Sequence, residues 1–247
     1  MKLKQTLLAV LLLFAVMLQA QAQDEKSSSD LNIGTAIVSS YVWRGMQFNA
    51  APNIQPYIDF NYKGFGVGAW ASVNFDGSYV EPDFYLYYKA NALTVTLYDY
   101  HNGGGLDYLN FETETTKHLV ELSAVYTISE SFPLSLTASA FIYGEDKKIS
   151  GYDLLSKPIL DPAKNNYSSY FELSYNIPHP MASVDLSLGF VAAESNFYGT
   201  EGFGLINAGI KVSKEIKITE SFSLPVFSQF VVNPTAEAAY FAFGLSF

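Results

Sequence analysis

Residues Tyr240-Phe241-Ala242-Phe243-Gly244-Leu245-Ser246-Phe247 alternate between two kinds of side chain. One parity is apolar and largely aromatic, and the other is small or polar. Because successive side chains of a β-strand point to opposite faces, this stretch predicts a strand with one apolar face. A strand of this kind is typical of a membrane β-barrel, whose outer face contacts lipid.

The N-terminal residues have the pattern of an export signal. Lys2 and Lys4 precede the apolar run 7–18, and Ala20-Gln21-Ala22 is a small-x-small cleavage site. An apolar run of about a dozen residues is too short to cross a bilayer, so we predict a signal peptide over 1–22. We expect a polar, mobile lead-in over 23–30 and one outer-membrane β-barrel over 31–247.

The same alternation recurs along the rest of the chain, between short turn signals. In 65–75, for example, Phe65, Val67 and Val73 share a parity opposite to that of Gly66 and Trp70. The fold class predicted from this pattern is all-β, a closed antiparallel barrel of about twelve strands, or ten or fourteen if 214–221 is misassigned. The predicted strands are 31–43, 53–62, 65–75, 80–89, 92–101, 117–127, 133–143, 168–177, 182–192, 203–213, 222–232 and 237–247.

Short and long connections should alternate, with the short ones on the periplasmic side. The connections 63–64, 90–91, 128–132 and 178–181 are short, whereas 101–116 and 144–167 are long. We expect apolar residues of 144–167 to pack into the barrel mouth or over it. The alternative is an apolar tip that touches lipopolysaccharide or a neighbouring molecule.

The composition agrees with this fold class and excludes several functions. The chain is 49% hydrophobic and 16% aromatic but only 15% charged, which suits a lipid-facing exterior with aromatic girdles. It contains no cysteine, so a disulfide framework, a thiol nucleophile and a thiolate metal site are excluded. The formal net charge of −10 argues against nucleic acid as a partner.

A soluble β-sandwich would also show alternating strands. It would have to hide the aromatic face of every strand between two sheets, which this number of large apolar residues makes difficult. We therefore expect the following residues to face lipid: Phe60, Phe65, Phe75, Phe84, Tyr88, Phe171, Tyr175, Phe190, Phe241, Phe243 and Phe247.

Residues 32–74 contain three short motifs that together resemble a known family. They are Ser40-Tyr41-Val42-Trp43-Arg44-Gly45-Met46, Pro52-Asn53-Ile54-Gln55, and Gly68-Ala69-Trp70-Ala71-Ser72 followed by Asn74. This segment resembles the TorF-like family of outer-membrane porins, although Gln47 replaces the usual serine or threonine after Met46. The resemblance implies a porin and names no solute.

Arg44 ends the first predicted strand, where the chain turns into 45–52. In a lumen it would be a constriction residue that binds anions or carboxylates. The interpretation we prefer is structural, a buried ion pair that holds the first hairpins in register. The candidate partners are Asp59, Glu81 and Asp83.

Two groups of residues share the lumen parity of their strands. Large aromatic side chains form a wall that either guides sugars and aromatic solutes by stacking or fills a small barrel. Acidic residues outnumber Arg44, Lys89 and Lys211, so a conducting pore should favour cations modestly. The candidate pore-lining residues are Arg44, Tyr57, Asp59, Trp70, Glu81, Asp83, Tyr85, Tyr87, Tyr98, Tyr100, Glu121, Glu172 and Asp185.

The three histidines give weak evidence for chemistry. His101 and His118 bracket the third outer loop and could approach each other across it, and His179 lies in a turn between two prolines. The simplest interpretation is that they are solvated loop residues. The alternative is a metal site formed by His101, His118 and Asp107. Because no serine has a hydrolase signature, we predict no catalytic residue, no metal site and no cofactor.

These observations favour a narrow channel for passive diffusion of small solutes, and not an enzyme. Barrels of about eight strands are filled by side chains and those of about sixteen are open, so an intermediate barrel should be partly plugged. The alternatives are a non-conducting barrel whose outer loops bind a ligand or surface partner, and a barrel hydrolase. We expect a monomer whose partners are outer-membrane lipid, small solutes and the barrel-assembly machinery.

Overall fold

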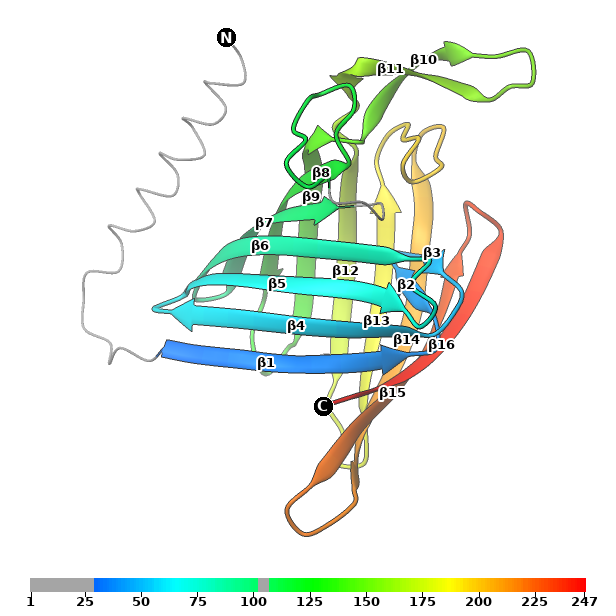
Figure 1. The fold of residues 1–247 in the computed structure, drawn as a ribbon. Coiled ribbons are helices and arrows are strands. Elements are labelled where there is room, and N and C mark those ends of the chain that lie inside the picture. Colours follow the sequence, from blue (N-terminus) through cyan, green and yellow to red (C-terminus); the bar gives the residue numbers. More distant parts are fainter. Residues whose placement is uncertain (1–28, 102–106) are drawn as a thin grey trace.

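The computed structural model describes residues 29–101 and 107–247 (Figure 1). Within these ranges twelve antiparallel strands form a closed barrel, so the predicted fold class and strand number are confirmed. In their order around the barrel, the strands are β1 (Ser29–Val38), β4 (Asn53–Tyr62), β5 (Phe65–Asn74), β6 (Val80–Ala90), β7 (Leu93–His101), β8 (His118–Thr127), β9 (Leu134–Gly144), β12 (Ser169–Ile177), β13 (Ser183–Val191), β14 (Gly204–Lys217), β15 (Ser223–Asn233) and β16 (Ala238–Ser246).

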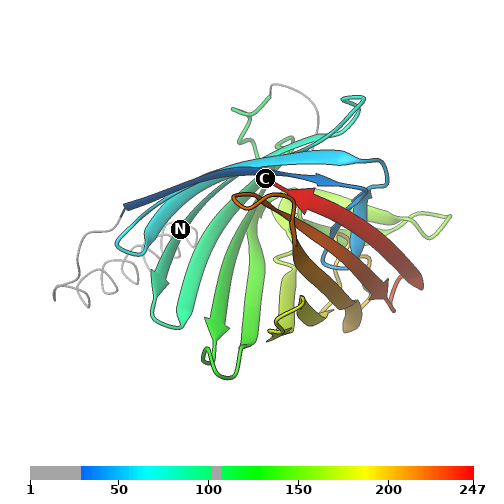
Figure 2. The same cartoon turned by 90° about the horizontal axis from the view of Figure 1, so that it is seen from below.

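The barrel closes where its first and last strands meet. Ala36 pairs with Ser246 and Val38 with Gly244, and the backbone N–H of Phe247 donates to the carbonyl oxygen of Thr35 at 2.9 Å. Figure 2, seen from below, shows β1 in dark blue beside β16 in red. Closure pairs the backbone N–H and C=O groups at the two strand edges with each other. In an apolar surrounding these groups would have no other hydrogen-bond partner.

The N-terminal end of the barrel differs from the prediction. The expected signal peptide over 1–22, and residues 23–28 of the lead-in, lie outside the described residues. Ser29 and Asp30, which we expected to be mobile, pair with Tyr62 and Asn61 at the start of β1. The first strand therefore begins two residues earlier than alternation alone indicated.

The predicted strand 31–43 is wrong in its second half. The chain leaves the barrel wall at Ser39 and Ser40, which form a bend, and continues as a separate hairpin of β2 (Tyr41–Trp43) and β3 (Met46–Asn49). At the other uncertain segment, β14 runs on to Lys217, so the turn before β15 covers only 218–222. The strand number is unaffected.

The two ends of the barrel differ in the length of their connections, as predicted. The end with the longer connections, which we call the outer end, carries 107–117, the segment 192–203 and a separate hairpin of β10 (Lys147–Tyr152) and β11 (Pro158–Asn165). In Figure 1 the β10–β11 hairpin projects away from the barrel, and Leu154 and Leu155 at its tip are exposed. The expectation that 144–167 packs into the barrel mouth or caps it is therefore wrong.

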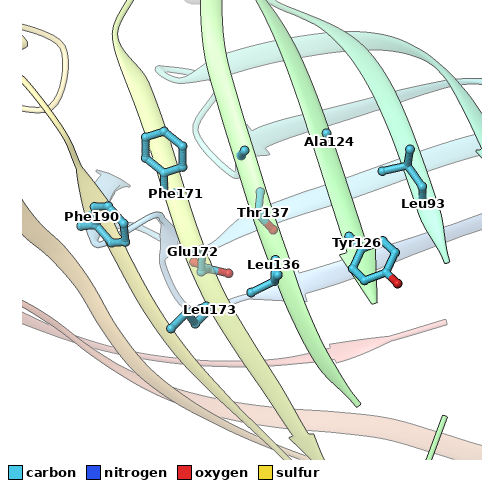
Figure 3. Close-up of a pocket in the computed structure, with 10 residues that line it drawn as sticks. Leu93, Ala124, Tyr126, Leu136, Thr137, Phe171, Glu172, Leu173 and Phe190 are labelled. Carbon is cyan, nitrogen blue, oxygen red and sulfur yellow. The ribbon is translucent and has the colours of Figure 1, made fainter. Parts of the chain in front are cut away.

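The outward parity of the barrel is apolar. Phe60, Phe65, Phe84 and Phe241 are 43–61% exposed, whereas Tyr88, which we expected on the same face, is buried. Across residues 29–101 and 107–247, no helix is long and apolar enough to span a membrane. A shallow outer groove of about 360 Å³ runs over β8, β9 and β12, with Tyr126, Leu136, Phe171, Leu173 and Phe190 around it (Figure 3).

A cluster of buried apolar residues lies inside the barrel. It consists of buried residues of the wall and of the connection 192–203, with Trp43 and Met46 of the β2–β3 hairpin packed against it. Two segments of the chain thus fold inward and fill the outer part of the interior. The buried members are Leu119, Phe141, Tyr170, Val191, Tyr198 and Ile206.

Candidate functional site: the barrel interior

The β2–β3 hairpin crosses the interior from one wall to the other. Tyr41 donates its hydroxyl to Oε1 of Glu81 on β6, at 3.0 Å. On the far side, Asn233 of β15 donates its Nδ2 to the carbonyl oxygen of Gly45, also at 3.0 Å. Because β6 and β15 are well separated around the closed barrel, the hairpin occupies the lumen at this level.

The tip of the hairpin is a two-residue turn formed by Arg44 and Gly45. Their φ angles are 48° and 75°, and Trp43 pairs with Met46 across them. Two positive φ angles in succession define the tight turn that matches the twist of antiparallel strands. Gly45 is also confined, since a Cβ there would lie 1.6 Å from the carbonyl oxygen of Ile206.

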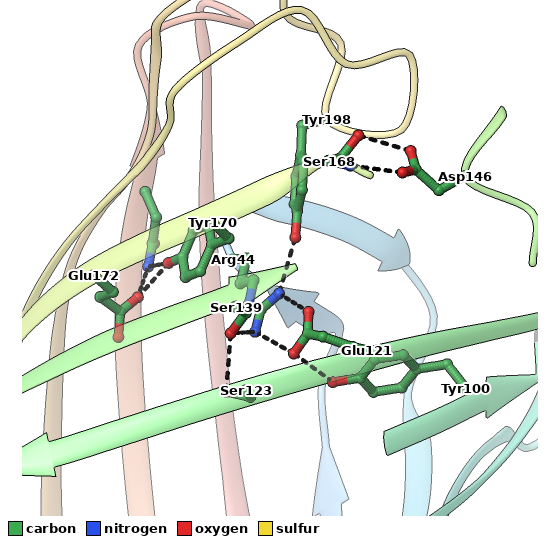
Figure 4. A network of polar contacts seen from close by, with 11 residues as sticks. Arg44, Tyr100, Glu121, Ser123, Ser139, Asp146, Ser168, Tyr170, Glu172 and Tyr198 are labelled. Carbon is green, nitrogen blue, oxygen red and sulfur yellow. Dashed lines mark hydrogen bonds and ion pairs between the residues drawn. The ribbon is translucent and has the colours of Figure 1, made fainter. Parts of the chain in front are cut away.

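The Arg44 guanidinium is held by a network of polar and aromatic contacts (Figure 4). Its Nη2 donates to Oε1 of Glu121 at 2.9 Å, and its Nη1 donates to the other carboxylate oxygen. Further donations reach the hydroxyl of Tyr198 at 2.8 Å and Oγ of Ser139 at 3.2 Å. A bidentate pair of this kind is both strong and directional.

Two aromatic rings pack against the same guanidinium. Its central carbon lies 4.3 Å from the ring centroids of both Trp43 and Tyr170. The Arg44 side chain is 10% exposed and that of Glu121 only 1%. The predicted structural role as an ion pair thus has a geometric basis, but the expected partners Asp59, Glu81 and Asp83 are wrong. The partner is Glu121, which lies across the lumen on β8.

A cavity of about 590 Å³ lies against the hairpin and the wall formed by β4 to β9. Of the candidate pore-lining residues, it brings together Arg44, Tyr57, Trp70, Asp83, Tyr85, Tyr87, Tyr98 and Tyr100. It is also lined by residues that sequence reasoning missed, namely Tyr41, Trp43, Thr94, Thr96, Ser123, Val125 and Thr137. The threonines and the serine lie on the lumen parity of β7, β8 and β9. This parity could have identified them as lining residues from the sequence.

The tyrosine wall of this cavity is built on glycines. Tyr85 and Tyr87 on β6 pair with Gly68 and Gly66 on β5, where a Cβ would lie 2.3 Å and 2.1 Å from the respective rings. The bare backbone therefore lets each ring lie flat across its neighbour strand. Tyr98 and Tyr100 stack with ring centroids 5.4 Å apart and an interplanar angle of 9°. The rings form a continuous aromatic surface, as alternation on strands 53–101 predicted.

Apart from Glu121, the remaining acidic candidates lie outside the lining of this cavity and accept hydrogen bonds from neutral groups. Asp59 accepts from the hydroxyl of Tyr87 at 3.0 Å, and Glu81 accepts from those of Tyr41 and Tyr79. On the opposite wall, Glu172 accepts from Nδ2 of Asn207 at 2.8 Å, and Asp185 accepts from Asn176. The interior is thus acidic, with few basic groups to balance it.

The inward-folded segment 192–203 contributes Tyr198 to the buried cluster inside the barrel. Tyr198 stacks on Phe141 and Tyr170, with ring centroids 5.7 Å and 5.9 Å apart. Nearby, the Asp146 carboxylate accepts from the backbone N–H and Oγ of Ser168, both at 2.7 Å. Burial raises the pKa of Asp146 above its usual range, while these hydrogen bonds oppose the rise. Composition and alternation did not indicate either contact.

His101 and His118 approach each other, with ring centroids 5.0 Å apart. Nδ1 of His118 lies 2.8 Å from Asp99, its Nε2 lies 2.8 Å from the carbonyl oxygen of Tyr108, and Phe111 stacks on its ring. Both ring nitrogens are thus engaged in holding the outer loop against β7 and β8. No group of three or more potential metal ligands occurs among residues 29–101 and 107–247.

The fold and interior define a closed antiparallel β-barrel with an apolar exterior and an internal hairpin. No family model matches the chain, and no curated protein matches it. Among solved structures, it is similar to the crystal structure of an outer membrane channel from Pseudomonas putida F1. The identity is 14%, the match covers 91% of this chain and 98% of that one, and the TM-score is 0.42. A likeness this distant carries no conclusion about function.

Proposed function

We propose that this protein is an outer-membrane channel through which small solutes diffuse passively. The observation that carries the proposal is a closed barrel with an apolar exterior around a polar and aromatic cavity of about 590 Å³. A closed barrel satisfies every backbone group of its wall and is therefore stable in lipid. The motifs in 32–74 that resemble TorF-like porins agree with this proposal.

The β2–β3 hairpin sets the narrowest part of the channel. It is anchored to one wall through Glu81 on β6 and Glu121 on β8, and to the opposite wall through Asn233 on β15. Solutes that pass the hairpin meet the acidic interior, so modest cation preference is part of the proposal. Arg44 contributes little to anion attraction, because Glu121 neutralises it.

Two measurements test this function. The protein should fractionate with outer membranes and migrate differently on gels before and after boiling, since a closed barrel resists detergent. Purified protein should then produce discrete conductance steps in planar bilayers. Recovery as a soluble periplasmic protein would contradict the membrane location, and a folded barrel without conductance would contradict the channel.

A non-conducting barrel that binds a partner through its outer loops is the second candidate. The observation that favours it is the exposed apolar tip of the β10–β11 hairpin, where Leu154 and Leu155 are 105% and 76% exposed. Absence of conductance both in the native protein and after removal of the β2–β3 hairpin would favour this candidate. The hydrolase alternative gains no support, because His118 is fully buried and already paired.

A further inference from the structure

One carboxylate in the cavity lacks the partners that its neighbours have. Asp83 on β6 lines the cavity and is 5% exposed, and its Oδ1 has no hydrogen-bond partner among the described residues. The carboxylates of Asp59, Glu81, Glu121, Glu172 and Asp185 each accept a hydrogen bond from another side chain. A buried carboxylate oxygen without a partner is costly, and the cost is relieved either when the carboxyl takes up a proton or when a cationic donor binds to it.

The charges around Asp83 favour a cation as that group. Glu81 is two residues away on the same strand and accepts only from neutral hydroxyls, those of Tyr41 and Tyr79. Arg44 also lines the cavity, but its guanidinium is engaged by Glu121 on the other side. The wall of the cavity around Asp83 therefore holds two carboxyl groups with which no basic side chain of the described residues pairs.

The cavity walls suit the apolar part of an organic cation. The rings of Tyr98 and Tyr100 are stacked in parallel, and the ring centroids of Tyr85 and Tyr98 are 5.8 Å apart. Both tryptophans of the chain, Trp43 and Trp70, line the same cavity. Aromatic faces attract cations through the ring quadrupole and bury apolar groups, and the volume lies within the range of small-molecule sites.

We propose that this cavity is a binding site for small organic ammonium ions, with the ammonium at Asp83 and its apolar substituent against the tyrosines. A neutral sugar would stack on the same rings but would bring no positive charge to Asp83. The proposal rests on the proposed channel function for its biological role, as the site where a permeating cation is selected. Binding itself can be measured without conductance.

The test uses the fluorescence of Trp43 and Trp70 in the refolded, detergent-purified protein. Phenethylammonium is the probe, and 2-phenylethanol, phenylacetate and maltose are its neutral, anionic and sugar comparators. We expect a saturable change with phenethylammonium at least about tenfold tighter than with 2-phenylethanol, because only the cation forms a charged hydrogen bond. Equal binding of the neutral analogue, or tighter binding of maltose, would overturn the proposal.

Asp83→Asn should weaken phenethylammonium binding about tenfold or more and leave 2-phenylethanol unchanged. The matched control is Asp185→Asn, which removes an interior carboxylate outside the cavity and should leave the affinity within about twofold. Heat-modifiable gel mobility establishes that both variants are folded. Unchanged affinity in folded Asp83→Asn would refute the site.

Conductance measured on the same preparation separates the two proposals. Conductance without phenethylammonium binding would refute the cation site alone and leave the channel intact. Binding without conductance would refute passive diffusion and leave the cation site intact.

Discussion

Arg44 at the tip of the β2–β3 hairpin and Glu121 on β8 form a bidentate ion pair across the barrel lumen. The two residues are 77 positions apart in sequence. Their contact makes the β2–β3 hairpin an internal bridge, because it holds the tip of the hairpin against β8 inside the barrel.

Removing one partner of this pair should destabilise the barrel strongly. Arg44→Ala or Glu121→Gln leaves a buried group without its partner, which typically costs about 3–5 kcal/mol of unfolding free energy. Urea unfolding in detergent measures the change. The control is Lys117→Ala, which breaks the Lys117–Glu145 pair with its 56% exposed lysine and should cost at most about 1 kcal/mol.

The double variant Arg44→Leu with Glu121→Leu should be less destabilised than either single variant, because no buried charge is left unpaired. An additive loss in the double variant would show that the pair does not act as a unit.

Gly45→Ala should displace the hairpin. A Cβ at this position meets the Ile206 carbonyl oxygen at 1.6 Å, and backbone cannot move aside as a flexible side chain would. Gly77→Ala is the matched control, since Gly77 also has a positive φ, 72°, but no atom lies within 4 Å of its Cβ position. The control should lose only about 1 kcal/mol from backbone strain. Equal losses in urea unfolding would contradict the close approach.

A charge on the outer face should cost far more than one on the inner face. Leu188 is outward-facing and 43% exposed, whereas Ser187 lies beside Asn207 in the lumen. Leu188→Arg should therefore cost about 2–4 kcal/mol in lipid vesicles, and Ser187→Arg much less. The opposite order would mean that the sidedness of β13 is reversed.

The inner hairpin, and not the longest outer loop, should control conductance. Replacing residues 41–48 by a flexible Gly-Ser linker should raise single-channel conductance, because the segment that crosses the lumen is gone. Deleting 150–161 should leave it unchanged, because the β10–β11 hairpin projects away from the barrel. A rise on deletion of 150–161 alone would show that the loop enters the pore.

With a salt gradient across a planar bilayer, the reversal potential should show that the channel passes cations modestly better than anions. Asp83, Glu81 and Asp59 lie on the wall of the lumen, and charged groups that line a pore set its ion preference. The preference should fall in Asp83→Asn. Anion preference in the native protein would contradict the acidic character of the interior.

The strands themselves were readable from the sequence, because their pattern is local. Side chains two positions apart on a strand face the same side of the barrel wall. Because one side faces lipid and the other a polar lumen, apolar and polar residues alternate along the sequence. The turn at Lys63 and Gly64 was equally local, since their positive φ angles of 49° and 81° reflect the tight-turn conformation. These features determined the fold class and the strand number.

The internal bridge was decided only by the tertiary structure. Alternation continues through Tyr41 and Trp43, so nothing in the local pattern marks the point at which the chain leaves the wall. The choice of Glu121 over Asp59, Glu81 or Asp83 depends on how far the hairpin reaches across the lumen, which barrel closure and register determine. The sequence therefore determined which residues face inward, while the closed barrel decided which of them meet.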